Sequence, residues 1–249
     1  MPWIAVASLL VANLAHAKSL SLTAADGTKL HAESFGEGSN GVIFIHEDDG
    51  SGEDYDYHAN RFAAAGFHVL TLDMRGHGQS SGTQDDYTNM VQDIDAAIGW
   101  LVNAGAEKVA LVGSKLGANL ALTAAAGNNS ITNLVLLSPG FNIQGVTVAG
   151  VNDYQGPLLL VSAEDDAYAT RTCGILEERA LGDDHWQMVE GSASGTRMLS
   201  RDADLEGVIL SWLNGTFRLT REAADAGASL AGTGDMTEVE TTGKHIGER

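Results

Sequence analysis

The sequence predicts one α/β domain: a mainly parallel sheet with helices on both faces, preceded by an antiparallel hairpin at its N-terminal edge. Short apolar runs alternate with segments of helical period, as in chains whose parallel strands are joined by helices. Asp26-Gly27 separates the first two strand-like runs, and this dipeptide is a strong hairpin signal. The 249 residues, 44% of them hydrophobic, suffice for one sizeable core.

The expected strands are short and mostly apolar, which is typical of strands buried on both faces. In chain order they are residues 19–23, 29–34, 42–46, 67–72, 109–112, 134–137, 158–162 and 186–189. Only seventeen residues separate Pro139 from Pro157, so we expect no large cap domain between the strands on either side of this segment.

Four segments are expected to be helical. Apolar residues recur at helical spacing in residues 90–101 and again in residues 205–213. Residues 118–126 are rich in alanine, and residues 170–181 contain Cys173, which is the only cysteine. A single cysteine excludes an internal disulfide and a thiolate zinc cluster, so we expect Cys173 to be a small buried hydrophobic residue.

Two terminal segments are expected to lie outside the domain, which we assign to residues 18–217. Residues 1–17 carry no charged side chain and end in Ala15-His16-Ala17, the small-x-small pattern of a signal-peptidase site. We therefore expect an exported protein, periplasmic or extracellular, with an uncleaved membrane anchor as the alternative. Residues 218–249 mix glycine, threonine and glutamate without apolar period, which predicts a disordered acidic tail.

The chain is strongly acidic, with a formal net charge of -19 and a sequence pI near 4.5. Such a surface repels phosphate backbones and anionic lipid headgroups. We therefore expect no nucleic-acid partner and, once the leader is removed, no stable membrane association. No cofactor is expected.

One pentapeptide, Gly113-Ser114-Lys115-Leu116-Gly117, stands between a strand-like run and the alanine-rich helix. This is the frame of a nucleophile elbow, a sharp strand-to-helix turn that needs small residues on both sides of its apex. The apex residue here is Lys115, where acyl chemistry would need a hydroxyl. Ser114 precedes the apex, so we expect its side chain to point away from the cleft.

Several stretches resemble the α/β-hydrolase family, particularly its cap-less dienelactone hydrolase and serine esterase types. In chain order they are Phe44-Ile45-His46, Leu72-Asp73-Met74-Arg75-Gly76-His77-Gly78-Gln79-Ser80, the elbow, Leu160-Val161-Ser162-Ala163-Glu164-Asp165-Asp166, and residues 190–198, which look like the histidine loop of the family. The resemblance covers roughly residues 20–213 and implies the α/β-hydrolase fold.

The resemblance also implies where a Ser-His-acid triad would stand. The acid position falls on Asp166, and Asp165 is nearly as good a candidate. The alternative is that both carboxylates only keep their loop solvated. The nucleophile position holds Lys115 and the base position holds Ser194. His77 lies in the Arg-Gly-His-Gly turn and is expected to be structural, whereas His46 ends a strand, and neither matches the base position. We therefore expect a degenerate triad that does not support Ser-His-Asp hydrolysis.

The turn that supplies the oxyanion hole in the family begins here with His46, Glu47 and Asp48. Carboxylates oppose the negative charge that develops at an oxyanion site. The acidic run continues to Asp56, but its spacing fits no standard calcium loop, so we favour a helix-capping turn and expect no metal site.

Nearby carboxylates are expected to outweigh the helix dipole, so that Lys115 keeps its positive charge and pairs with Asp166. A lysine that bends out to solvent is the simpler alternative. Three functions remain open: a non-catalytic protein that binds a small molecule or a protein partner in the old cleft, a hydrolase with a rearranged Ser194-Lys115 site, and an interaction module whose cleft is closed.

Overall fold

The computed structural model describes residues 17–217. Nearly all of the expected leader, and the whole of the expected tail at 218–249, lie outside the described residues. Within residues 17–217, no helix is both long and apolar enough to cross a membrane.

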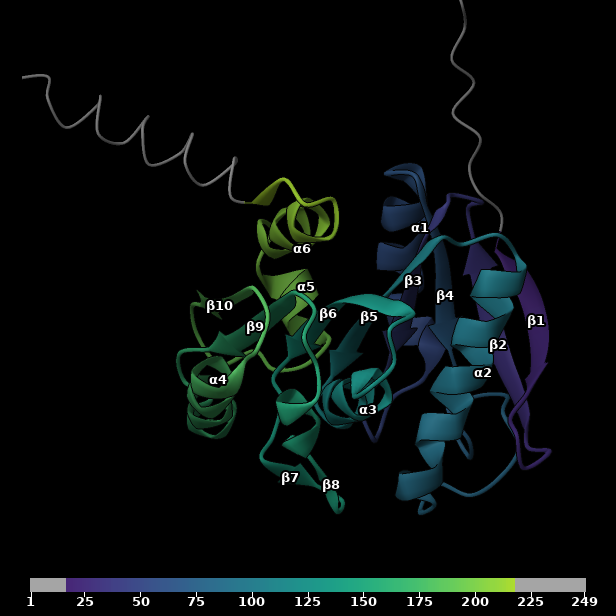
Figure 1. Ribbon diagram of the computed structural model, residues 1–249, viewed down its shortest axis with the longest axis horizontal. Coiled ribbons are helices and arrows are strands. Elements are labelled where there is room, and N and C mark those ends of the chain that lie inside the picture. The colour runs from purple at the N-terminus through teal and green to yellow at the C-terminus, as the bar shows by residue number, and fades with distance from the viewer. Residues whose placement is uncertain (1–16, 218–249) are drawn as a thin grey trace, which may run out of the picture.

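The centre of the fold is an eight-stranded sheet with the order β1-β2-β4-β3-β5-β6-β9-β10 (Figure 1). Its strands are β1 Lys18–Thr23, β2 Lys29–Phe35, β3 Asn40–Ile45, β4 Phe67–Leu72, β5 Lys108–Ser114, β6 Ile131–Leu137, β9 Leu158–Ala163 and β10 Asp184–Val189. β2 pairs antiparallel with both β1 and β4, and every other pairing is parallel. The expected hairpin and the mainly parallel sheet are confirmed.

Within residues 17–217, six α-helices cover the two faces of the sheet (Figure 1). They are α1 Asp56–Ala64, α2 Met90–Asn103, α3 Leu116–Ala125, α4 Ala167–Arg179, α5 Arg197–Arg201 and α6 Leu205–Leu213. Buried residues of α2, α3 and α4 pack with one face of the sheet, and those of α1, α5 and α6 pack with the other.

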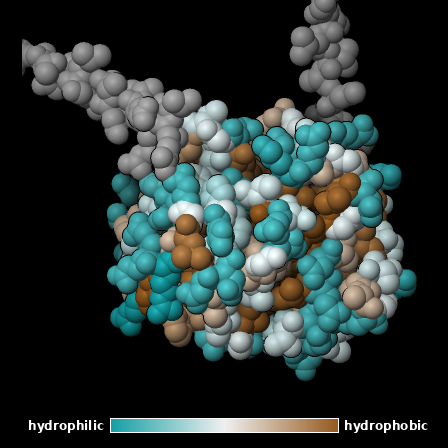
Figure 2. Space-filling model, viewed as in Figure 1, coloured by the Kyte–Doolittle hydropathy of each residue, from teal (hydrophilic) through white to brown (hydrophobic). Residues whose placement is uncertain are grey.

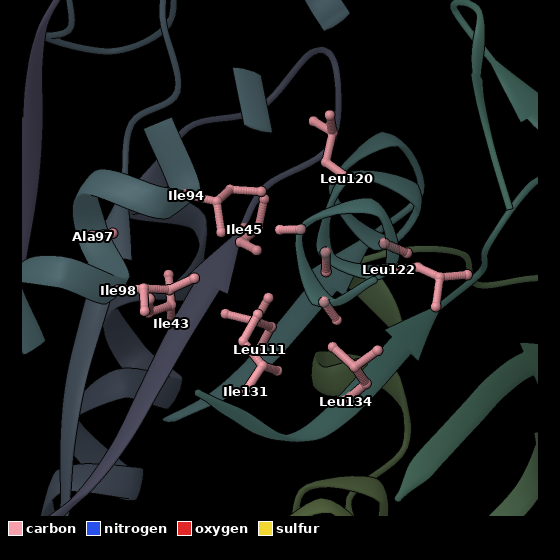
Figure 3. Close-up of a cluster of buried hydrophobic side chains, with 14 of the residues drawn as sticks. Ile43, Ile45, Ile94, Ala97, Ile98, Leu111, Leu120, Leu122, Ile131 and Leu134 are labelled. Atoms are coloured by element: carbon pink, nitrogen blue, oxygen red, sulfur yellow. The ribbon is translucent and has the colours of Figure 1, made fainter. Parts of the chain in front are cut away.

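Alternation along the central strands explains why both faces are buried. In β3, Ile43 and Ile45 join the cluster under α2 and α3, whereas Val42 and Phe44 join the cluster under α1. Figure 3 shows the first cluster, where residues of α2 and α3 meet β3, β5 and β6. Each fully buried aliphatic side chain contributes about 1.5–3 kcal/mol to folding.

Cys173 lies in α4 and is fully buried, as expected. Burial raises the pKa of its thiol to about 12. The thiol is therefore neutral and packs as a small apolar group.

Only a small insertion separates β6 from β9. It holds two-residue strands β7 (Asn142–Ile143) and β8 (Val146–Thr147) and one 3-10 turn, Ala149–Asn152. This insertion adds no large cap. The face shown in Figure 2 is mainly hydrophilic, with hydrophobic side chains in smaller groups between the polar ones.

A buried arginine fastens the N-terminal hairpin to the rest of the domain. Arg75, 1% exposed, donates hydrogen bonds to Asp93 of α2 (2.6 Å) and to Asp26 in the hairpin turn (2.7 Å). A third carboxylate, that of Asp86, accepts at 2.8 Å. These hydrogen bonds raise the pKa of Arg75, so it stays charged where it is buried.

Candidate functional site

The elbow predicted from the sequence is present. β5 ends at Ser114, α3 begins at Leu116, and Lys115 between them has φ 47° and ψ -109°, a strained conformation for a residue with a side chain. A Cβ atom on Gly113 would lie 2.3 Å from the carbonyl oxygen of Gly117, and one on Gly117 would lie 2.3 Å from that of Ile45. Only glycine fits at either position, which explains the small residues on both sides of the apex.

The ammonium group of Lys115 forms an ion pair with the carboxylate of Glu47. Glu47 is 8% exposed and follows β3, the strand next to β5, in which Ile45 is paired with Gly113. Among the described residues, Oε2 of Glu47 has no partner other than this ammonium group. A nearly buried carboxylate is thus neutralised by the residue at the nucleophile position.

The expected contact between Lys115 and Asp166 is wrong. Asp166 is the N-cap of α4, and its carboxylate accepts a hydrogen bond from the backbone N–H of Ala169 (3.0 Å). The strand order explains the error: β3 is adjacent to β5, whereas β9, which precedes Asp166, is separated from β5 by β6. Glu47 therefore reaches the elbow more directly. Asp165, the alternative acid, is exposed.

Ser194, at the base position, is half-buried, and within residues 17–217 no hydrogen bond joins it to Lys115. The next residue, Gly195, instead lies against Glu47, where a Cβ would stand 2.9 Å from Oε2 of that carboxylate. Thr196 then lines the cleft together with Lys115. The structure therefore does not form the Ser194-Lys115 pair expected for a rearranged hydrolase.

Beneath the elbow lies a small buried hydrogen-bonded group. The side chain of Ser114 is fully buried, as expected for a residue that points away from the cleft, and bonds to the hydroxyl of Tyr55. Thr196 reaches the same serine oxygen at 3.3 Å. Burial raises the pKa of the Tyr55 phenol, so the hydroxyl stays neutral. The sequence analysis assigned no role to Tyr55 or Thr196: Tyr55 belongs to no recognisable motif, and within the histidine-loop stretch the resemblance marks only Ser194 as a site residue.

His46 and His77 hold the turn that carries Glu47. The Nδ1–H of His46 donates to the carbonyl of Glu47 (2.6 Å), and its Nε2 accepts from the backbone N–H of Met74 (3.1 Å). Burial lowers the pKa of His46 to about 4, which keeps the ring neutral. His77 packs on this ring and bonds to the carbonyl of Asp48 (3.0 Å). Both rings bond to the backbone and are therefore structural, as expected for His77.

A cleft of about 360 Å³ opens over the elbow. It is lined by Glu47, Asp49, Gly50, Asp54, His58, Lys115, Thr196, Arg197 and Ser200. Three carboxylates thus face two basic groups, and the lining is largely polar. His58 is held by the buried carboxylate of Glu206 (2.9 Å), so its Nδ1 is already engaged. Within residues 17–217, no three histidine, cysteine or acidic side chains are grouped so that they could hold a metal ion.

Known proteins match this chain mainly through their folds. A family model described as serine aminopeptidase, S33, matches residues 39–153, a segment that includes the elbow. No curated protein sequence matches the chain.

Solved esterases and a dienelactone hydrolase share its architecture. The Pyrococcus furiosus esterase Pf2001 superposes with a TM-score of 0.72 at 18% identity, covering 80% of this chain and 92% of that one. The dienelactone hydrolase from Anabaena variabilis superposes with a TM-score of 0.70 at 15% identity, covering 81% of this chain and 98% of that one. The esterase EaEST from Exiguobacterium antarcticum superposes with a TM-score of 0.66 at 18% identity, covering 79% of this chain and 100% of that one.

Together with the strand order and the elbow, these matches identify the chain as an α/β-hydrolase-fold protein. At its strand-to-helix elbow, the apex residue Lys115 forms an ion pair with Glu47.

Proposed function

We propose that this is an exported α/β-hydrolase-fold protein that binds a small polar molecule or a protein partner in the cleft over Lys115 and does not hydrolyse substrates at the elbow. The observation that carries the proposal is the ion pair between Lys115 and Glu47 at the apex of an otherwise intact elbow.

Two physical arguments support the absence of elbow catalysis. A protonated amine held by a carboxylate has no free electron pair with which to attack a carbonyl carbon. The carboxylate of Glu47 also stands in the turn that would stabilise an oxyanion, where negative charge opposes the reaction.

The lining of the cleft supports a polar ligand. Most drug-like ligands occupy largely apolar pockets, whereas this cleft carries three acidic and two basic side chains. Arg197 and Lys115 offer donors for a carboxylate or phosphate, while Asp49 and Asp54 offer acceptors for an amine or hydroxyl groups. A zwitterionic or hydroxylated molecule matches both sets.

Thermal unfolding with a panel of amino acids, hydroxy acids and sugars tests binding in this cleft. We expect at least one panel member to raise the melting temperature of the wild type, and the shift to be lost in R197A, which removes an exposed cationic group at the rim. R171A, an exposed arginine on α4 outside the cleft, is the matched control. No shift with any member would favour the closed interaction module.

Restoring serine at the apex of the elbow tests whether the cleft accepts acyl substrates. Lys115→Ser alone would leave Glu47 nearly buried and unpaired, so the variant that is needed is K115S/S194H/E47Q. We expect this triple variant to gain turnover of a short-chain ester, with K115S/E47Q as the control that lacks the base. If the folded triple variant stays inactive, the cleft does not accept acyl substrates.

Export is proposed from the uncharged, apolar residues 1–17. N-terminal sequencing of the protein recovered outside the cytoplasm is expected to begin at Lys18. A sequence that begins at Met1 would instead support the uncleaved anchor.

A further inference from the structure

A second group of polar side chains comes from β1, β2 and the residue after β4. Figure 1 shows these strands at one edge of the sheet. Oγ of Ser19, on β1, is 3.0 Å from Nε2 of His31, on β2. Nδ1 of the same imidazole is 3.1 Å from Oδ2 of Asp73, which follows β4. Serine hydroxyl, imidazole and carboxylate are thus joined through the same atoms as in a Ser-His-Asp triad.

The carboxylate of Asp73 is held rigidly. It is 5% exposed, its Oδ1 accepts the backbone N–H of Gly52 (2.8 Å), and its Oδ2 accepts that of Gln79 (2.8 Å). Gly78 has φ +51°, and a Cβ there would stand only 2.1 Å from Oδ2, so the loop closes on the carboxylate only with glycine. The carboxylate of Asp73 is thus held in place against Nδ1 of His31, where it can accept the Nδ1–H and orient the ring.

The backbone around the imidazole is equally fixed. The N–H of His31 donates to Oγ of Ser80 (2.8 Å), and its carbonyl accepts the N–H of Asp73 (3.0 Å). With Nδ1–H directed at Asp73, the lone pair of Nε2 faces Ser19 and can accept its hydroxyl proton.

An open cavity of about 460 Å³ gives a substrate access to these groups. Ser19 is exposed and lines the cavity together with His31 and Asp73. The rim is acidic: it includes Glu53, Asp56 and Glu33, whose Oε1 lies 3.3 Å from Nε2 of His31.

The acidic rim selects the charge of the substrate. Burial raises the pKa of Asp56, and the charges of Glu33, Glu53 and Asp73 raise it further. The negative potential of these rim carboxylates repels anionic acyl groups and attracts cationic ones. It also stabilises the imidazolium that forms during reaction.

We propose that Ser19, His31 and Asp73 form a second, hydrolytic site that cleaves esters whose acyl and alcohol parts are neutral or cationic. Oγ of Ser19 attacks the carbonyl carbon while its proton passes to Nε2 of His31. The ester C–O bond then breaks, and the alcohol leaves with that proton. A water molecule next gives a proton to His31 and attacks the acyl-serine, which releases the acid and returns the proton to Ser19. The balance is one ester and one water for one acid and one alcohol.

Labelling the full chain with an uncharged fluorophosphonate, followed by peptide mapping, tests this site. We expect the tag on Ser19, no tag at that position in S19A, and labelling at least about 100-fold slower in H31Q, which lacks the general base. S21A is the matched control: Ser21 is exposed on the same strand and faces His31 in the β1–β2 register, and its loss should leave the labelling rate unchanged.

The map also separates this proposal from elbow chemistry. A tag on Ser19 that depends on His31 supports the second site, whereas a tag confined to Ser194 or Ser114 overturns it and contradicts the inactive elbow as well. An untagged Ser19, or equal labelling rates in the wild type and H31Q, overturns the second site and leaves the account of the elbow unaffected. The three substitutions lie on β1, the edge strand, and on β2 beside it, and circular dichroism verifies that the variants are folded.

Discussion

The ammonium of Lys115 meets the carboxylate of Glu47 across the ends of two neighbouring parallel strands, β5 and β3. The resemblance of the sequence to α/β-hydrolases places the apex of the elbow at Lys115 and the turn of the oxyanion hole at Glu47. Each charge stabilises the other. The cation of Lys115 at a helix N-terminus and the nearly buried anion of Glu47 would both be unfavourable alone.

A double-mutant cycle with K115M and E47Q measures this coupling. The lysine side chain is 28% exposed and the carboxylate 11%, so the pair is only partly screened by water. We expect a coupling free energy of about 1–2 kcal/mol in urea unfolding, above that of an exposed pair. Additive effects of the two substitutions would contradict a stabilising pair.

Gly117→Ala tests the close packing of the elbow. The new Cβ would stand 2.3 Å from the carbonyl oxygen of Ile45, and backbone on both sides cannot yield easily. We expect a loss of about 2 kcal/mol or more in the free energy of unfolding. Gly99→Ala in α2, where a Cβ meets nothing within 4 Å, is the control and should stabilise by about 0.5–1 kcal/mol. Equal effects of the two substitutions would refute tight packing at the elbow.

Arg75→Met tests the fastening of the hairpin. It would leave Asp93, which is 0% exposed, as a buried carboxylate without its cation. Chemical denaturation should show a loss of about 3–5 kcal/mol. Arg171→Ala, at an exposed position on α4, is expected to change stability by no more than about 0.5 kcal/mol. A loss at Arg75 as small as this would rule out a structural role for the network.

Acid should destabilise the fold through His46. Its pKa is lowered by burial from 6.5 to about 4, so between these values the unfolded state binds a proton that the folded state does not. Stability from the neutral ring is therefore complete above about pH 6.5 and declines as the pH falls to 4, by about 2 kcal/mol between pH 6.5 and 5.

Urea unfolding at pH 7, 6 and 5 measures this decline. The His46→Asn variant is less stable at every pH, but its free energy of unfolding should decrease less than that of the wild type between pH 7 and 5, by about 2 kcal/mol. If the free energy of unfolding decreases equally with pH in the wild type and the variant, His46 does not cause the loss of stability in acid.

The sheet could be predicted from the sequence because its central strands are buried on both faces and therefore form continuous apolar runs. The elbow could be predicted because Gly113 and Gly117 are dictated by backbone contacts. Helix α1 was missed: within Asp56–Ala64 only three residues are buried, one of them a histidine, which gives a weak apolar period.

The partner of Lys115 could not be predicted from residue types alone. Several carboxylates were candidates, and only the strand order shows that Glu47 is adjacent while Asp166 caps a helix two strands away. Ser19, His31 and Asp73 come from three separate segments without a shared motif, and only the pairing of β1, β2 and β4 brings them together.

Hydrolysis of p-nitrophenyl butyrate by the S19A variant tests the central claim, an elbow without a nucleophile, most directly. This variant lacks the proposed edge site, so any remaining turnover must arise elsewhere. The ion pair between Lys115 and Glu47 predicts a rate equal to that of buffer alone. Turnover that persists in S19A and disappears on Ser194→Ala would contradict it.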